Sequence, residues 1–354
     1  MKKSLQSVVD RDSKSTGTGA AWAREDLVRG LRQVVVEPGD TVFFQVCSEP
    51  LGSARGASTD GELCQILEGA LREAVGPNGT ILTPSYTFSF CRQQVFDVAE
   101  SPTVRGPWNT FTPFPDHLRR LPGAIRSRDP IFSTAGLGPR AAQLLTGLPP
   151  VCLGEDSVHA RLRKVGGKIV IVGVGLYEAI FRHYVESVTR VPWRYDKLFT
   201  GVVRENGKDR REGWLYNVRI LASNGDPAGE ALERLSRDLG ICRAAPLGDG
   251  EILCVDSEAF FELTTRELRR DPWFTARGPA GDPLAIEEAR TEANTKLAPL
   301  APNASMSKII ESLWKLPRDL VSNGYDAALR ALSSQVPMTI HEYRTGTECW
   351  TWIV

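Results

Sequence analysis

Among the four histidines of this 354-residue chain, His183 has the neighbours that most suggest chemistry. An imidazole has a reference pKa of about 6.5, which suits proton transfer near neutral pH. Glu186 follows three residues later, so in a helix the two side chains share one face. The carboxylate could orient the ring or hold a substrate cation. The same pair is also common on exposed helix surfaces, so spacing alone leaves a structural role open.

A second candidate lies in RSRDPIFSTAGLG, residues 126–138, where basic residues and Asp129 precede Pro130. Alone, such a stretch is typical of a surface turn that enters a strand. Asp129 could instead share the role of base with His183 or bind a substrate amine. The other histidines predict less: we expect His117 on a solvated helix and His159 near a helix start.

Strands and helices alternate along the chain and must position these groups. Apolar runs predict strands at 41–48, 79–90 and 167–176, and helical spacing predicts helices over 60–75 and 178–189. Fully apolar strands alternating with helices indicate a layered α/β fold with a largely buried sheet. Each strand is followed by glycines or serines, and ligands of open α/β sheets bind at such strand ends. No Rossmann or P-loop glycine pattern is present.

Composition narrows the class of protein. Lys plus Arg and Asp plus Glu both number 43, so no global charge draws the chain to nucleic acid or an anionic membrane. The seven cysteines are odd in number and form no C-x-x-C pair, which argues against a disulfide framework or a metal site. No apolar run reaches the roughly 18 residues of a membrane span. We therefore predict a cytoplasmic protein with a disordered arm at residues 1–20.

Four sequence blocks together carry a resemblance. In order they are D-x-V-F-F-x-x-x-S-x-x-x-L-G, G-P-x-G-T-I-L-x-P-S-Y-T-F-S, P-G-A-I-R-S-x-D-P-I-F-S-x-A-x-x-G, and G-G-K-I-V-I-V-G-V-G-L-x(6)-H-Y-V-E-x(4)-V-P-W-R-Y. Over residues 25–300 the chain resembles the aminoglycoside 3-N-acetyltransferase family. The resemblance implies a three-layer α/β/α sandwich of that family's own type, distinct from the GNAT fold. It implies an N-acetyltransferase with acetyl-coenzyme A as co-substrate and a small amine as acceptor.

The family's H-x-x-E block coincides with His183 and Glu186, and its active-site segment includes Asp129. We predict His183 as the general base, with Asp129 as the alternative. Backbone amides near two strand ends and one later loop are predicted to bind the coenzyme, at Val46, Cys47, Ser48, Leu51, Gly52, Ser85 and Ser133. Cys47 is expected to pack, since no histidine lies nearby in sequence to activate its thiol. For Arg126 and Arg128, gripping coenzyme phosphates and flanking a turn are equally supported.

Two departures bear on the substrate. Aminoglycoside-modifying members usually read His-Pro where this chain has Asp129-Pro130, and His-Ser-Ser where it has Gln45-Val46-Cys47. The pattern looks more like relatives associated with surface-polysaccharide or natural-product amino sugars, so we predict an amino sugar or a natural-product precursor. A catalytically degenerate docking module, an enzyme using another acyl-CoA and a hydrolase stay open.

The end of the chain differs from the rest. We predict an acetyltransferase domain over 21–300, followed by a linker and a C-terminal segment over 301–354. The run LPRDL through HEY resembles the opening of an aminopeptidase-like domain family, without its zinc-ligand part. A homodimer and a partner that docks on this segment both stay open.

Overall fold

The computed structural model describes residues 21–104, 113–220 and 225–278, together with 327–330, 332, 348–349 and 352–353. The chain divides into two compact units, Met1–Asn294 and Thr295–Val354. The predicted N-terminal arm and most of the predicted linker and C-terminal segment lie outside the described residues. In the second unit the described part comprises helical residues 327–330 and the antiparallel strands β11 (Glu348–Cys349) and β12 (Trp352–Ile353).

A seven-stranded mixed sheet forms the centre of the first unit, in the order β4-β5-β2-β1-β6-β10-β9. Its central strands β2, β1 and β6 run parallel, and the flanking β5 and β10 run antiparallel to them. The strands are β1 (Thr41–Val46), β2 (Thr80–Pro84), β4 (Ile125–Arg126), β5 (Thr134–Leu137), β6 (Lys168–Val172), β9 (Arg243–Leu247) and β10 (Gly250–Asp256).

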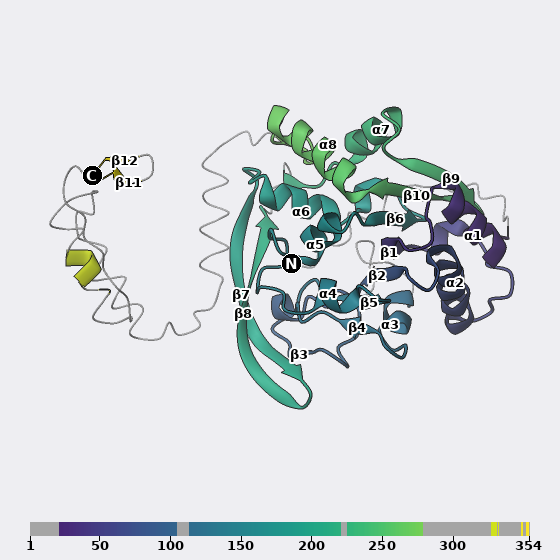
Figure 1. Ribbon diagram of the computed structural model, residues 1–354, viewed down its shortest axis with the longest axis horizontal. Coiled ribbons are helices and arrows are strands. Elements are labelled where there is room, and N and C mark those ends of the chain that lie inside the picture. Colours follow the sequence, from purple (N-terminus) through teal and green to yellow (C-terminus); the bar gives the residue numbers. More distant parts are fainter. Residues whose placement is uncertain are drawn as a thin grey trace, which may run out of the picture. The chain divides into compact units, whose positions relative to one another are not determined.

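Helices cover both faces of this sheet (Figure 1). One face packs against α1 (Arg24–Gln33), α2 (Asp60–Val75) and α3 (Phe114–Leu118). The other packs against α4 (Ala141–Leu145), α5 (Val158–Lys164), α6 (Phe181–Val188), α7 (Glu230–Asp238) and α8 (Ser257–Arg270). Short 3-10 turns follow three strands or loops, at η1 (Glu49–Leu51), η2 (Phe90–Arg92) and η3 (Leu176–Glu178).

Strand β1 shows why the molecule has three layers. All six of its residues are buried, and its side chains alternate between two hydrophobic cores. Phe43 belongs to the core beneath α5 and α6, whereas Val42, Phe44 and Val46 belong to the core beneath α1 and α2. A strand that is apolar on both sides must be covered on both sides. The predicted α/β/α sandwich is therefore confirmed.

Local signals explain the helices that matter most for position. Helix α2 begins after Thr59, whose hydroxyl accepts from the Glu62 amide while Glu62 caps the Thr59 amide in return. It ends at Gly76, where φ is 65°. These bounds match the predicted helix. Strand β2 is shorter than the predicted 79–90 because the backbone from Ser85 to Ser89 bonds to the turn at 130–133 instead of continuing the sheet.

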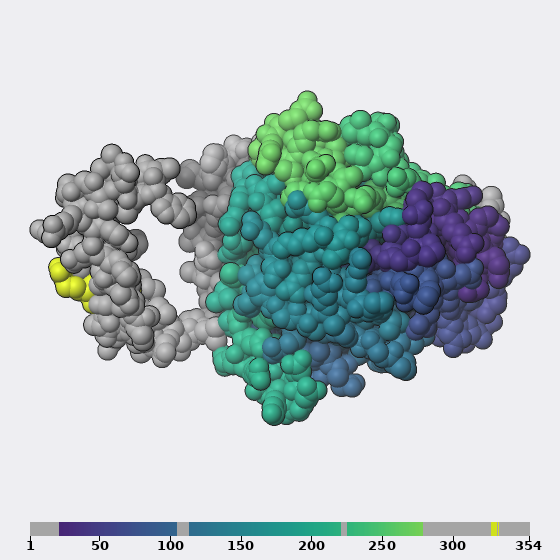
Figure 2. All heavy atoms as spheres, viewed as in Figure 1, coloured from purple at the N-terminus to yellow at the C-terminus, as the bar shows by residue number. Residues whose placement is uncertain are grey.

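A long hairpin was missed by the sequence analysis. Strands β7 (Arg194–Glu205) and β8 (Lys208–Arg219) pair along their whole length, and the short β3 (Phe96–Asp97) adds to β7. Its turn is Asn206-Gly207, with φ of 51° and 72°, the pair of positive values that a type I′ turn requires. The end of the hairpin projects from the body of the first unit (Figures 1 and 2).

No helix in the described ranges is long and apolar enough to cross a membrane. Within the same ranges, no cluster of three or more His, Cys, Asp or Glu side chains is arranged to hold a metal ion.

Candidate active site

Helix α6 carries both residues of the predicted catalytic pair. It follows β6 through the η3 turn, so its start lies at the carboxyl end of a central parallel strand. His183 and Glu186 lie on the same face, as the spacing predicted, and the Nδ1 atom of His183 is 2.7 Å from Oε2 of Glu186. The structure therefore brings these two residues together.

Glu186 is fully buried and is saturated with donors. Its Oε1 atom accepts from Arg182 Nη1 at 3.1 Å and from the Thr275 hydroxyl at 2.7 Å. Its Oε2 atom lies 2.8 Å from Arg194 Nη2, in addition to His183. Although burial opposes ionisation, Arg194 and Arg182 lower the pKa of Glu186 well below its usual range. The carboxylate is thus a fixed negative charge behind the imidazole.

His183 keeps one ring nitrogen available. Its side chain is 17% exposed, and no described residue hydrogen-bonds to Nε2. Burial, followed by the charge of Arg194, lowers its pKa to about 4, while Glu186 acts in the opposite direction. The imidazole is therefore neutral at physiological pH, as a base must be before it takes a proton.

His159 lies near a helix start, as expected, but its burial was not foreseen. It is the second residue of α5, whose N-cap is Ser157, but its ring is buried against Phe43 and Phe181 at centroid distances of 5.1 and 5.8 Å. Burial and then the nearby His183 lower its pKa to about 3. Its Nδ1 atom has no hydrogen-bond partner in the described part of the chain. His117 is also less solvated than expected, because its Nε2 atom lies 2.7 Å from a carboxylate oxygen of Glu68.

Asp129 has hydrogen-bond partners of its own. Its Oδ1 atom accepts from the amides of Ile131 and Phe132, both at 2.8 Å, and from the Cys152 thiol at 3.4 Å. None of its hydrogen bonds reaches His183 or Glu186. It is 4% exposed, and burial raises its pKa to about 6. This carboxyl therefore holds the turn that enters β5, while no described residue donates to Oδ2.

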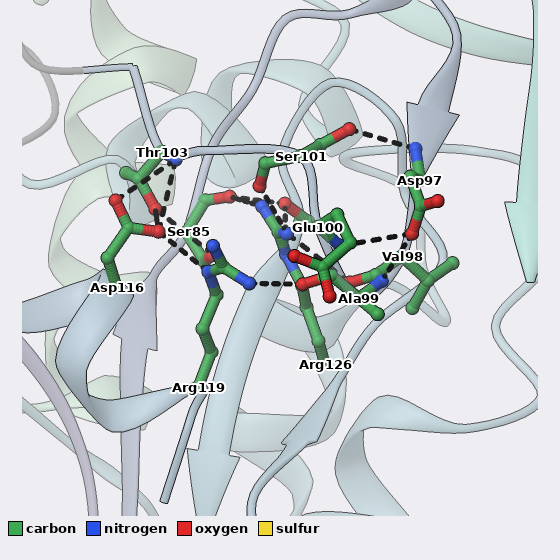
Figure 3. Close-up of polar contacts among 11 residues, drawn as sticks. Ser85, Asp97, Val98, Ala99, Glu100, Ser101, Thr103, Asp116, Arg119 and Arg126 are labelled. Atoms are coloured by element: carbon green, nitrogen blue, oxygen red, sulfur yellow. Dashed lines mark hydrogen bonds and ion pairs between the residues drawn. The ribbon is translucent and has the colours of Figure 1, made fainter.

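Ser85 and Ser133, both predicted to contact the coenzyme, lie together beneath the surface. Neither is exposed, and the Ser133 hydroxyl donates to the Ser85 carbonyl. Arg126 packs beside them and donates to the carbonyls of Ser85, Val98 and Ser101 (Figure 3). Burial and then Arg119 lower the pKa of Arg126 to about 9. This guanidinium holds the loop after β3 in place and has no free side to offer a phosphate.

Arg128 also has protein partners. Its guanidinium pairs with Glu212 at 2.5 Å on β8 and with Glu205 at 3.2 Å on β7. The contacts of Arg126 and of Arg128 therefore favour a structural role for both residues over binding of coenzyme phosphates.

The end of β1 holds the remaining predicted coenzyme residues. Val46, Cys47 and Leu51 are buried, so their side chains pack and only their backbone could meet a ligand. The loop approaches β6 closely: a Cβ on Gly173 would lie 1.9 Å from the Cys47 carbonyl oxygen. Cys47 thus has the packing role that was expected.

Ser48 and Gly52 line a surface cavity of about 330 Å³, which extends to the start of α2. The amides of Ser58 and Thr59 at this helix start are taken by the Glu62 carboxylate, at 2.7 and 2.9 Å. That negative charge disfavours a phosphate at the helix start. The cavity suits the amide-bearing pantetheine part of a coenzyme better than its phosphates.

Three members of the polar cluster were not foreseen: Arg182, Arg194 and Thr275. Arg194 was quoted only as part of the V-P-W-R-Y block, and Thr275 lies 89 residues beyond Glu186. Asn206-Gly207 is a turn signal for a hairpin, but it does not indicate that the first strand begins at Arg194. Nothing in the sequence points to Thr275.

Comparisons with known proteins identify the family. A family model described as "Aminoglycoside 3-N-acetyltransferase" matches residues 56–269. Aminoglycoside N(3)-acetyltransferase VII of Streptomyces paromomycinus is 28% identical over 248 residues, which cover 64% of this chain and 84% of that protein. A second model, a domain of unknown function (DUF4910), matches residues 307–354. It leaves the predicted likeness of this segment to an aminopeptidase-like domain as a prediction.

Solved structures share the fold. The structure titled AAC-VIa bound to sisomicin has a TM-score of 0.60 and 27% identity, and covers 71% of this chain and 98% of its own. The structure titled AAC-IIIb binary with CoASH has a TM-score of 0.60 and 20% identity, and covers 74% and 100%.

Proposed function

The chain belongs to the aminoglycoside 3-N-acetyltransferase family, and from that premise we propose that it acetylates an amine of an amino sugar or a related natural-product precursor. It is an N-acetyltransferase with acetyl-coenzyme A as the donor, as the sequence blocks predicted. The observation that carries the proposal is the contact of the partly exposed His183 with the buried Glu186, both of which lie inside the matched residues.

The chemistry requires a base. The acceptor nitrogen bonds to the acetyl carbon, the carbon–sulfur bond of the thioester breaks, and the sulfur leaves as the thiolate of coenzyme A, which takes up the proton that the amine loses. We assign the proton released by the amine to Nε2 of His183, the ring nitrogen to which no described residue hydrogen-bonds. Glu186 holds the proton on Nδ1 and stabilises the imidazolium that forms. The residues proposed to hold the coenzyme are the backbone of Val46, Cys47 and Leu51 and the cavity residues Ser48 and Gly52.

The remaining predicted residues support this site from below. Ser85 and Ser133 are unexposed, so we assign them to shaping the floor of the coenzyme channel. For Asp129, the lack of contact with His183 argues against a shared base, and we assign its Oδ2 atom to the acceptor amine.

The charges near the base bear on the acceptor. Arg182 and Arg194 outnumber Glu186, so the cluster behind the imidazole has a net positive charge. If Asp129 is counted as ionised, the net charge of these four side chains is zero. A polycationic aminoglycoside is better bound by an excess of carboxylates. The balance therefore supports an acceptor with few positive charges.

Thiol release from acetyl-coenzyme A, measured across amino sugars, sugar nucleotides and aminoglycosides, tests the proposal. We expect an amino sugar or a sugar nucleotide to stimulate release, with an acetyl amide as the product by mass spectrometry. If no amine stimulates release and calorimetry shows no coenzyme binding, the proposed activity is wrong. If only aminoglycosides react, the activity stands and the proposed substrate class is wrong.

A further inference from the structure

Arg194 is held rigidly beside the catalytic pair. It is the first residue of β7, and its side chain is 2% exposed. Its Nη1 atom donates to the carbonyl of Asn217 on β8 at 2.7 Å, and its guanidinium lies 5.0 Å from the ring centroid of Trp193. The hairpin therefore fixes where this guanidinium points.

Its Nη2 atom creates a conflict at His183. Nη2 lies 2.6 Å from Nδ1 of His183 and 2.8 Å from Oε2 of Glu186, while Nδ1 and Oε2 are 2.7 Å apart. In a neutral imidazole, Nδ1 either carries a proton and donates or lacks one and accepts. It cannot donate to Glu186 and accept from Arg194 at once.

The carboxylate resolves this conflict. Glu186 is ionised, and one carboxylate oxygen can accept from two donors. If Nδ1 lacked a proton, its lone pair would face a lone pair of the anionic Oε2 atom at 2.7 Å, and neither group could turn away. If Nδ1 carries the proton, the close contact is the 2.6 Å one between Nδ1 and Nη2, and both N–H bonds can turn from each other toward Oε2. The consistent arrangement therefore has Nη2–H and Nδ1–H both directed at Oε2, with the lone pair of the ring on Nε2.

We infer that Arg194 is a positioning residue of the reaction: it holds Glu186 so that His183 keeps its proton on Nδ1 and presents a bare Nε2 to the acceptor. The inference rests on the proposed role of His183 as the base. Arg182 on α6 holds the other carboxylate oxygen, so the two guanidinium groups grip Glu186 from two elements.

The same arrangement keeps the ring neutral. The charged and titratable groups that face His183 are Arg182 and Glu186 on α6, Arg194 on β7 and His159 on α5. Two buried cations against one anion oppose a further positive charge on the ring. A weak base of this kind suffices, because an amine nitrogen that has bonded to the acetyl carbon becomes strongly acidic. Arg194 thus serves both the tautomer and the charge state of His183.

Nitrogen-15 NMR of the imidazoles in the full chain, with pH titration, tests the inference. His183→Ala assigns the resonance among the four histidines. In the unmodified protein we expect a protonated Nδ1 and a bare Nε2 down to about pH 5. A protonated Nε2 in the neutral ring would overturn the inference without any variant.

Arg194→Met should raise the pKa of His183 by about one unit or more, because a cation within hydrogen-bond distance is removed. The apparent pKa of the acid limb in the pH profile of kcat/KM should rise by the same amount. Both neutral tautomers of His183 should become populated. Arg194→Lys should restore the acid limb but not the single tautomer, since a lysine supplies the charge without the planar fork.

Arg219→Met is the matched control. Arg219 pairs with Arg194 across the hairpin but bonds to Asp226 and touches neither member of the pair. Arg219→Met should leave the tautomer of His183 and the acid limb of the kcat/KM profile unchanged. If Arg194→Met loses activity while tautomer and pKa stay the same, Arg194 is only structural and the inference is wrong. If His183→Ala retains its activity, the proposed base is wrong instead.

Discussion

The two ring nitrogens of His183 have different surroundings, and this asymmetry predicts how variants behave. His183→Ala should lower turnover by about 10²–10⁴-fold, the usual effect of removing a general base, with coenzyme affinity nearly unchanged. His183→Gln should not restore turnover, because an amide cannot take a proton. Steady-state kinetics with calorimetry for the coenzyme measure both. Near-normal turnover of His183→Ala, with Asp129→Asn inactive, would make Asp129 the base.

Asp129 predicts a pH dependence of stability. Burial raises its pKa to about 6, so the native state holds the proton more tightly than the unfolded chain does. The stability that this provides is complete below about pH 4 and is lost as the pH rises through 6. Asp129→Asn keeps the Oδ1 acceptor without the charge. It should therefore gain stability relative to the parent protein as the pH rises, by at most about 3 kcal/mol.

Urea unfolding of both proteins at pH 4.5 and pH 8 measures this difference. A difference that does not vary with pH would contradict the raised pKa of Asp129.

Single residues also mark the limit of what the sequence could predict. His183 and Glu186 follow from type and spacing, because a helix alone places them together. Arg194 and Thr275 join them only through the hairpin and the segment after α8, which are brought in by tertiary folding. The burial of His159 was missed for the same reason, since its partner Phe43 lies on a strand 116 residues earlier.

At the scale of elements, the close approach of the β1 loop to β6 predicts a strong effect at Gly173. Gly173 has φ of 78°, and Gly166 at the other end of β6 has φ of 65° with open space around it. Gly166→Ala should destabilise the protein by about 1 kcal/mol, through backbone conformation alone. Gly173→Ala should lower stability by roughly 3 kcal/mol or more, because its Cβ meets the Cys47 carbonyl.

Gly173→Ala should also weaken coenzyme binding, since the displaced loop includes Ser48 and Gly52. Chemical unfolding and calorimetry on both variants test this. Equal losses of stability would show that the close approach has no energetic consequence.

Elements differed in how well the sequence predicted them. Helix α2 was predicted with its bounds because a capping box and a terminal glycine are local signals. Strand β2 was predicted too long, because its continuation is apolar but pairs with a distant turn. The β7–β8 hairpin was missed because its half-exposed strands lack a continuous apolar run.

For the whole molecule, the alternation of apolar strands and helices predicted a layered α/β fold with a buried sheet, and the family resemblance implied the α/β/α order of the layers. Strands that are apolar on both faces require two helical layers, and the chain has helices enough for both. The strand order did not follow, since β5 and β10 enter the sheet antiparallel and no periodicity reveals direction. The family resemblance implied the type of sandwich, which periodicity alone could not, because proteins that share the four blocks share one fold.

The two cores of the sandwich differ in how closely they adjoin the catalytic pair, and this difference matters for protein engineering. Several buried polar atoms near His183 lack hydrogen-bond partners within the described residues, including His159 Nδ1, Arg182 Nε and Arg194 Nε. His159 and Arg182 lie on the helices α5 and α6 of the layer that carries the catalytic pair, and Arg194 lies on the adjoining strand β7. The opposite core, beneath α1, α2 and α3, is largely apolar, and only the start of α2 borders the cavity proposed for the coenzyme. A thermostable catalyst should therefore be sought by redesigning that core, where tighter packing need not slow turnover.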